Sequence, residues 1–412
     1  MCERVALVGV DWGDKQHAYE VRGIDGTRRC DMFESRPEAV HAWVSGLRAE
    51  YPSGTIAVAV EQSRGALIYA LSRYEFIEVI PVQPTRTAAY RGVARPSGAK
   101  SDPIDAGLIC DYVEKHGETI RALSPTDAVT RELMILVEWR RKLVDQRVTF
   151  SHQLRDTLKQ YFPQALDWSG ELGSPMSLAF LEQWPTLEVV KRSRPATIRS
   201  FYARHRCRSG ELIEARLSEM AAAVALHSDS AVIGALSTVA AAFVASIRSI
   251  SEQIAKLDHR IDQLWSTHPD RMIFESFPGA GKALAPRLAV ALGTDRSRWT
   301  ASAMQTFSGI APVLQQSGSK RWVHSRWSCP KFVRQTFHEF AEWSIPQCRW
   351  AAAFYRLQRS RGKGHHAAIR ALAFRWIRVI VRCWLDRKPY DDAQYTNRLV
   401  AAGSPVASTL AA

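Results

Sequence analysis

Residues 5–11 read Val-Ala-Leu-Val-Gly-Val-Asp, a run of apolar residues that ends on a carboxylate. Such a run is typical of a strand that is buried on both faces of a sheet. Residues 56–61, Ile-Ala-Val-Ala-Val-Glu, repeat the pattern and end on Glu61. The sequence therefore predicts two central strands, each with an acid at its carboxyl end.

Further strand and helix patterns surround these two runs. Residues 17–23 and 28–34 read as strands, and the turn residues Ile24-Asp25-Gly26-Thr27 join them into a hairpin. The other expected elements are, in order, helix 37–50, strand 55–61, helix 66–73, strand 78–82 and helices near 85–92 and 103–115. Three antiparallel strands followed by alternating helices and strands is the order of the ribonuclease H-like fold. We therefore predict an α/β domain of this type over residues 1–120.

The run Ala-Lys-Ser-Asp-Pro-Ile-Asp-Ala at 99–106 adds two more acids. If its proline lies in the first turn of a helix, Asp102 and Asp105 share one face of that helix. Two carboxylates held that close repel each other unless a cation lies between them. For Asp11 or Glu61 alone, a strand-end residue facing solvent is the better interpretation. The set of four acids instead favours a site for a hard divalent metal ion, and so phosphate chemistry.

Composition indicates a polyanionic partner. Lys plus Arg number 55 against 41 Asp plus Glu, a net charge of +14, and nucleic acid is the commonest partner of such a basic chain. Seven cysteines without any Cys-x-x-Cys spacing indicate reduced thiols and no structural zinc. The N-terminus carries no signal-peptide pattern, and charge is expected to interrupt every apolar stretch before membrane-spanning length. These features predict a soluble cytoplasmic protein with no membrane partner.

Residues 121–270 are predicted to form a helical, coiled-coil linker with an insertion. The stretch 129–158 is long, basic and amphipathic, whereas 163–210 is expected to be an irregular insertion. An apolar heptad seam then continues for four repeats through Leu236, Ala240, Phe243, Ile247, Ile250, Ile254, Leu257, Ile261 and Leu264. This seam is able to pack against 129–158 within one chain or to pair two chains. It supports rigid spacing or dimerisation and has no chemistry of its own.

Residues 271–390 are predicted to be a third, mainly helical domain, and 391–412 a flexible tail. Residues 274–281, Phe-Glu-Ser-Phe-Pro-Gly-Ala-Gly, lie between helical patterns like the turn of a helix-hairpin-helix element. In that element the turn and the amide groups of the next helix bind a backbone phosphate. A plain tight turn explains the same residues equally well. The stretch lacks the residues of a Walker loop, which excludes an ATPase of that class.

Ser317 precedes Gly318 in a polar, basic stretch that we expect to be a flexible loop. An exposed serine hydroxyl beside cationic groups is a candidate nucleophile, although a Ser-Gly pair is ordinarily only a turn. Basic and aromatic residues alternate over 321–334, which suits binding of a nucleic-acid strand by charge and stacking. The candidate nucleic-acid contacts are Lys100, Gly279, Gly281, Lys282, Gly318, Lys320 and Arg321.

Taken together, these motifs resemble those of the insertion sequence 110 family of transposases. The resemblance covers residues 5–160 and 270–360, and includes the family's Pro-Gly-x-Gly opening, the block at 308–312 and the Ser-Gly at 317–318. Cys329-Pro330 departs from the pattern, since many relatives carry Gly-Asn there. The family's DEDD signature is matched here by Asp11, Glu61, Asp102 and Asp105.

The resemblance implies a DNA recombinase whose N-terminal domain is similar to the RuvC resolvase and whose four acids bind Mg²⁺, or Mn²⁺. It implies that Ser317 attacks a DNA phosphodiester to form a covalent phosphoserine intermediate. It also implies a structured guide RNA (bridge RNA), encoded by the element, that pairs with donor and target DNA, and homodimers that assemble into tetramers. Two rivals stay open. A metal-dependent RuvC-like nuclease or Holliday-junction resolvase needs the four acids but not Ser317, and a nucleic-acid-binding scaffold needs neither.

Overall fold

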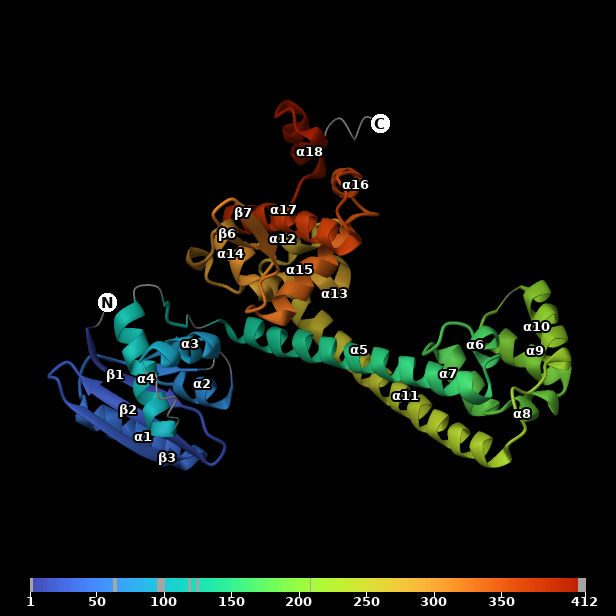
Figure 1. Ribbon diagram of the computed structural model, residues 1–412, viewed down its shortest axis with the longest axis horizontal. Helices are drawn as coiled ribbons and strands as arrows, with labels where there is room; N and C mark the ends of the chain where they lie inside the picture. The colour runs from blue at the N-terminus through green and yellow to red at the C-terminus, as the bar shows by residue number, and fades with distance from the viewer. Residues whose placement is uncertain are drawn as a thin grey trace. The chain divides into compact units, whose positions relative to one another are not determined.

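The chain forms two compact units, residues 1–126 and 127–412, each with its own hydrophobic core. Figure 1 shows the chain and labels helices and strands of each unit. The computed structural model describes residues 3–61, 65–94, 101–117, 120–123, 126–207 and 209–406.

The first unit is built on a five-stranded mixed sheet of order β3-β2-β1-β4-β5. β2 is antiparallel to both β1 and β3, while β4 is parallel to β1 and β5 to β4. The strands are β1 (Arg4–Asp11), β2 (Gln16–Gly23), β3 (Arg28–Glu34), β4 (Thr55–Val60) and β5 (Ile77–Pro81). The predicted three antiparallel strands followed by alternating helices and strands are confirmed, and the arrangement is consistent with a ribonuclease H-like fold.

Helices cover both faces of this sheet because its central strands are apolar on both sides. Val58 of β4 belongs to the core formed with α1 and α2, whereas Ala57 and Ala59 contact α4 residues such as Ile109 on the other face. The second face is lined by small side chains, so α4 is able to lie close to the strands. The helices of this unit are α1 (Pro37–Glu50), α2 (Ala66–Leu71), α3 (Pro84–Ala94) and α4 (Asp102–His116).

The second unit is organised by two long helices, α5 (Ala128–Tyr161) and α11 (Ser230–Ser266). Arg260 of α11 binds Glu132 near the start of α5, with 2.7 Å between Nη2 and Oε1. Phe243, earlier in α11, packs on Phe150, later in α5. Because one residue number rises as the other falls, the two helices are antiparallel.

The predicted heptad seam packs within the chain. Ala240, Ile247, Ile254 and Ile261, seven residues apart, are all buried. Of the two arrangements that the sequence left open, the structure thus shows the intramolecular pairing with α5.

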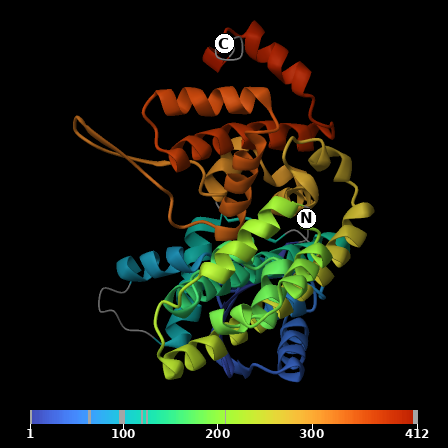
Figure 2. The same cartoon turned by 90° about the vertical axis from the view of Figure 1, so that its right-hand side faces the viewer.

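The stretch 163–210 is not irregular, so that expectation was wrong. It folds into short helices that form an aromatic-rich core with the ends of α5 and α11 (Figures 1 and 2). Pro175 and Pro195 each lie in the first turn of a helix, where the missing N–H has no intrahelical partner to lose. These prolines therefore mark helix starts. The helices are α6 (Ala165–Trp168), α7 (Pro175–Gln183), α8 (Leu187–Lys191), α9 (Pro195–Arg204) and α10 (Gly210–Ala222).

The rest of the second unit is mainly helical around α17, whose Trp376 packs on Trp350 and Phe340. A two-stranded sheet, β6–β7, interrupts the helices. The elements are α12 (Arg271–Glu275), α13 (Gly281–Leu292), η2 (Arg296–Arg298), α14 (Ala301–Phe307), β6 (Val313–Ser317), β7 (Lys320–His324), α15 (Lys331–Ser344), α16 (Arg349–Ser360), α17 (His365–Asp386) and α18 (Asp392–Ala401).

Helix α11 corrects one further expectation. Within the described part of the chain it is the one helix long and apolar enough to cross a membrane, by length and composition alone. Charge therefore does not interrupt every long apolar stretch. α11 packs against α5 here, and 17% of its most apolar stretch is buried.

Candidate active site

Asp11 and Glu61 come from neighbouring strands of the first unit. Asp11 ends β1 and Glu61 follows β4, and the two strands are parallel with Val10 paired to Val60. The carboxyl ends of parallel strands meet at one edge of a sheet, so both acids lie at the same edge. Glu61 is half-buried, and the hydroxyl of Thr87 on α3 donates a hydrogen bond to its Oε1.

Asp102 and Asp105 both lie in the first turn of α4, as predicted, with Pro103 between them. Asp102 is exposed. The side chain of Asp105 is only 4% exposed, and Arg91 of α3 neutralises it. Nη2 of Arg91 lies 2.8 Å from Oδ1 of Asp105, and Nε donates to the same oxygen at 3.0 Å. A buried carboxylate is stable here because a guanidinium is bound to it.

Gly9 allows α4 to approach the sheet. A Cβ atom at Gly9 would lie 2.4 Å from the carbonyl oxygen of Ala106 and 2.8 Å from Sγ of Cys110. Real Cβ atoms essentially never come this close to such atoms. The absent side chain in the middle of β1 thus fixes how near α4 lies.

The direction of α4 places its acids toward the edge where β1 ends. Along β2, Glu20 lies against Gly107, and Arg22 further on binds Glu114, with 2.5 Å between Nη1 and Oε2. Later residues of β2 therefore meet later residues of α4. Since β2 is antiparallel to β1, the start of α4 points to the Asp11 end of β1. The sheet topology thus directs all four acids to one edge.

The type of ligand fits a hard divalent cation, since all four groups are carboxylates. In the described residues, however, no three Asp, Glu, His or Cys side chains lie close enough together to hold a metal ion. Asp105 and Glu61 already have protein partners, because Arg91 binds Asp105 and Thr87 binds Glu61. A four-carboxylate metal site would require these two contacts to be exchanged for the cation.

Sequence reasoning missed Thr87 and Arg91. They lie four residues apart on α3 and so share the face that meets the acids. A Thr-x-x-x-Arg spacing in the predicted helix 85–92 was the available signal.

Ser317 lies in the second unit, on a hairpin instead of the flexible loop expected from the sequence. It ends β6 and pairs with Lys320, the first residue of β7, across a turn formed by Gly318 and Ser319. Gly318 has φ +57°, whereas Ser319 is not among the positive-φ residues. A positive φ at the first central residue alone is the signature of a type II′ turn, which requires glycine there. The Ser-Gly pair thus places the serine directly before the hairpin tip, where it is exposed.

The candidate nucleic-acid contacts fall into different settings. Gly279 has φ +84°, and a Cβ there would lie 2.5 Å from the carbonyl oxygen of Trp343, so tight packing alone explains this glycine. Gly281 and Lys282 begin α13 and are exposed, and Lys320 and Arg321 are exposed on β7. Lys100 lies outside the described residues.

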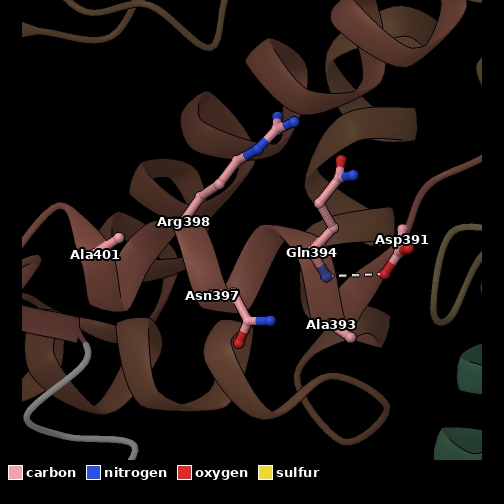
Figure 3. Close-up of a pocket in the computed structure, with 6 residues that line it drawn as sticks. All are labelled: Asp391, Ala393, Gln394, Asn397, Arg398 and Ala401. Carbon is pink, nitrogen blue, oxygen red and sulfur yellow. Dashed lines mark hydrogen bonds between the residues drawn. The ribbon is translucent and has the colours of Figure 1, made fainter.

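A surface pocket on α18 contains none of the predicted site residues (Figure 3). The side chain of Asp391 accepts a hydrogen bond from the backbone N–H of Gln394 and so caps the helix. The residues that line this pocket are Asp391, Ala393, Gln394, Asn397, Arg398 and Ala401.

Two transposase families match the chain, one over the part that contains the four acids and one over the part that contains Ser317. One, the DEDD transposase family of IS110, matches residues 8–163. The other, the transposase IS116/IS110/IS902 family, matches residues 271–356, which include Ser317. The chain belongs to the IS110 family of transposases. It is therefore an enzyme of DNA strand transfer, acting in transposition of an insertion element, and its family implies DNA as a partner and an intracellular location.

Relatives of this transposase come from several bacteria. The mini-circle protein for IS117 of Streptomyces coelicolor is 26% identical over 96% of this chain and 98% of its own length. A 43.6 kDa protein of insertion element IS110, from the same organism, is 28% identical over 82% of this chain and 84% of its own. The pilin gene-inverting protein of Moraxella bovis is 36% identical over 18% of this chain and 24% of its own. Transposases with DEDD acids are typically metal-dependent.

Proposed function

We propose that this transposase cuts and rejoins DNA through a covalent phosphoserine intermediate at Ser317. The observation that carries the proposal is the exposed position of Ser317 immediately before the tip of a basic hairpin. A hydroxyl at a protruding tip is able to reach a phosphate on a large substrate. The residues proposed to bind Mg²⁺ or Mn²⁺ in support of this reaction are Asp11, Glu61, Asp102 and Asp105.

The chemistry is a transesterification. Oγ of Ser317 attacks phosphorus, so an Oγ–P bond forms while the bond from phosphorus to one deoxyribose oxygen breaks. The serine proton passes to a base, and the departing oxygen takes up a proton. In the second step a deoxyribose hydroxyl displaces Ser317, and a phosphodiester bond is restored without loss of phosphate-ester energy. A divalent cation held by the four acids would stabilise negative charge that develops on the phosphate.

We further propose that a structured guide RNA directs the enzyme to donor and target DNA, and that homodimers assemble into tetramers in the bacterial cytosol. A net charge of +14 supports a nucleic-acid partner. In this proposal residues 1–120 form the RuvC-like domain, 121–270 the linker and insertion, and 271–390 the domain that carries Ser317, with a helix-hairpin-helix-like phosphate contact at Gly281. The name of the Moraxella relative, a gene-inverting protein, supports cutting and rejoining over simple cleavage.

The test is a search for the covalent intermediate. The protein is incubated with Mg²⁺, guide RNA and cognate DNA and then resolved on denaturing gels. We expect a protein–DNA adduct that Ser317→Ala abolishes, and that Ser319→Ala, the other serine beside Gly318, leaves in place. Asp102→Asn is expected to abolish both adduct and strand breakage.

Two outcomes would contradict the proposal. An adduct that persists in Ser317→Ala assigns the nucleophile to another residue. Breakage without an adduct, lost in Asp102→Asn but kept in Ser317→Ala, identifies the rival nuclease or junction resolvase.

A further inference from the structure

The β6–β7 hairpin has two chemically different faces. In an antiparallel pair, directly opposite residues share a face and successive residues alternate between faces. Ser317 is opposite Lys320, and Gln315 is opposite Trp322, so these four side chains lie on one face. The other face carries the pair of Leu314 and Val323 and the pair of Gln316 and Arg321.

On the first face, Trp322 is the diagonal neighbour of Ser317. Diagonal neighbours on a sheet have Cβ atoms roughly 7–8 Å apart, within reach of an aromatic side chain, while direct partners such as Ser317 and Lys320 are about 5 Å apart. Trp322 is 47% exposed, and the whole of β7 is exposed. An ammonium group and an indole ring therefore flank the serine hydroxyl on an open surface.

The charge of the surrounding chain selects the occupant of this surface. No Asp or Glu occurs between residues 296 and 338, and the five Lys and Arg residues from 320 onward in that stretch are uncompensated in sequence. A long uniformly basic stretch complements a polyanion, and an exposed aromatic side chain among cations is the pattern that stacks on bases of single strands. Nucleic acid satisfies both features at once.

We propose that this face of the hairpin positions an unpaired nucleotide for the reaction. Lys320 binds the phosphate that Ser317 attacks, and Trp322 stacks on the base beside that phosphate. Because a base within a duplex is already stacked on its neighbours, the DNA strand is unpaired where it is cut. The assignment of the phosphate rests on the proposed function of Ser317, whereas the stacking by Trp322 does not. Trp322 is thus a positioning residue, and the hairpin face selects for single-stranded DNA.

The test measures binding without chemistry, so a failure of the phosphoserine proposal does not affect it. The full chain is titrated, in buffer with a metal chelator, into fluorescein-labelled oligothymidylate of about 20 nucleotides, oligouridylate of the same length, and a blunt DNA duplex. Fluorescence anisotropy reports the affinity for each probe. A second oligothymidylate carries one 2-aminopurine, whose fluorescence reports base stacking.

We expect Trp322→Ala to weaken binding of oligothymidylate by about tenfold, since stacking contributes on the order of a factor of ten per base. Duplex affinity should change by less than about twofold. Trp322→Phe should restore most of the affinity and the 2-aminopurine quenching. Val323→Ala, on the opposite face and 65% exposed, should bind like the wild type. Lys320→Ala should reduce the slope of log affinity against log salt by about one.

Three results would overturn the inference. The first is a Trp322→Ala variant that loses single-strand and duplex affinity equally, because stacking on an unpaired base predicts a selective loss. The second is a loss confined to oligouridylate, which would reassign the base to RNA. The third is an unchanged single-strand affinity in Trp322→Ala together with a lost adduct in Ser317→Ala, which would refute the stacking role while leaving the serine chemistry intact.

Discussion

The two halves of the proposed chemistry are built in opposite ways. The acids of the first unit belong to a packed sheet, where β4 is apolar on both faces and Asp105 is 4% exposed beside Arg91. Ser317 belongs to a two-stranded hairpin in which every residue but Val313 is exposed. One set of groups takes its geometry from a hydrophobic core, and the other has no core of its own.

This difference indicates how each half becomes ordered for catalysis. A lone two-stranded hairpin is at best marginally stable in water, so we expect a bound strand to complete the order around Ser317. The acids, in contrast, are already directed to one edge of the sheet before any substrate arrives.

The largest expected effect on the contrast between the packed acid site and the exposed hairpin comes from adding a side chain at Gly9. In Gly9→Val the new side chain would overlap the carbonyl of Ala106, so α4 must move off the sheet. We expect a loss of about 3 kcal/mol in the free energy of unfolding of the first unit, together with loss of strand transfer. Chemical denaturation followed by circular dichroism measures the first effect.

Gly46→Ala is the matched control for Gly9. Gly46 lies in α1, and a Cβ atom there would have no neighbour within 4 Å, so alanine should stabilise that helix by about 0.5–1 kcal/mol. If Gly9→Val were as stable as the wild type, tight packing of α4 on β1 would not be what positions Asp102 and Asp105.

Removing Arg91 tests whether the buried acid is held for a metal ion. Arg91→Ala leaves the Asp105 carboxylate buried without its cation, and we expect a loss of about 3 kcal/mol, at the lower end for a broken buried pair. Mg²⁺ should raise the melting temperature of Arg91→Ala more than that of the wild type, because the cation replaces the lost charge. Differential scanning fluorimetry with and without Mg²⁺ measures both.

Arg91→Lys keeps the positive charge and should show a smaller loss. The double variant Arg91→Ala with Asp105→Asn should lose the added Mg²⁺ response. An equal Mg²⁺ response in the double variant would exclude Asp105 as a ligand.

Gly318→Ala adds a side chain at a glycine of the hairpin, as Gly9→Val does at a glycine of the sheet. Gly318 has φ +57° and no atom within 4 Å of a Cβ, so alanine costs only the local conformational penalty of about 1–2 kcal/mol. We expect the melting temperature of the whole protein to stay unchanged, while adduct formation falls because the tip no longer keeps its turn. Gly364→Ala, with φ −61° and equally open, is the control and should keep full adduct formation. A lowered melting temperature in Gly318→Ala would show that the hairpin is part of the folded core.

The sequence predicted the sheet better than the hairpin, for a physical reason. Strands such as 56–60 are buried on both faces, so they consist of continuous apolar residues that can be recognised in the sequence. β6 and β7 are exposed to solvent on both faces, so no alternation of polar and apolar residues marked Ser317 as part of a strand. The prediction for residues 163–210 was wrong because prolines such as Pro175 and Pro195 start helices there instead of interrupting them.

The acids themselves were visible in the sequence, but their present partners were not. Asp102 and Asp105 are recognisable from their spacing and from the helix that the proline between them begins. That Arg91 and Thr87 bind two of the acids depends on how α3 packs against the strand ends and α4. The Thr-x-x-x-Arg spacing places Thr87 and Arg91 on one helix face, but a single sequence does not show which elements that face will contact.

The smallest expected effect concerns His17, in the sheet of the first unit. His17 of β2 is buried, accepts a hydrogen bond from the backbone N–H of Gly13 at its Nδ1, and stacks on Trp12. Burial lowers the pKa of His17, so the folded first unit resists protonation of a group that the unfolded chain protonates below about pH 6.5. Its contribution to stability is therefore full above that pH and is lost as the pH falls through the folded pKa.

We expect the stability advantage of the wild type over His17→Gln to shrink as the pH is lowered from about 7 to about 5. Calorimetry at several pH values measures it. An advantage of the wild type over His17→Gln that stays constant with pH would mean that water reaches the His17 side chain. The contrast between a buried acid site in the first unit and a solvent-exposed hairpin around Ser317 would then be weaker than the packing indicates.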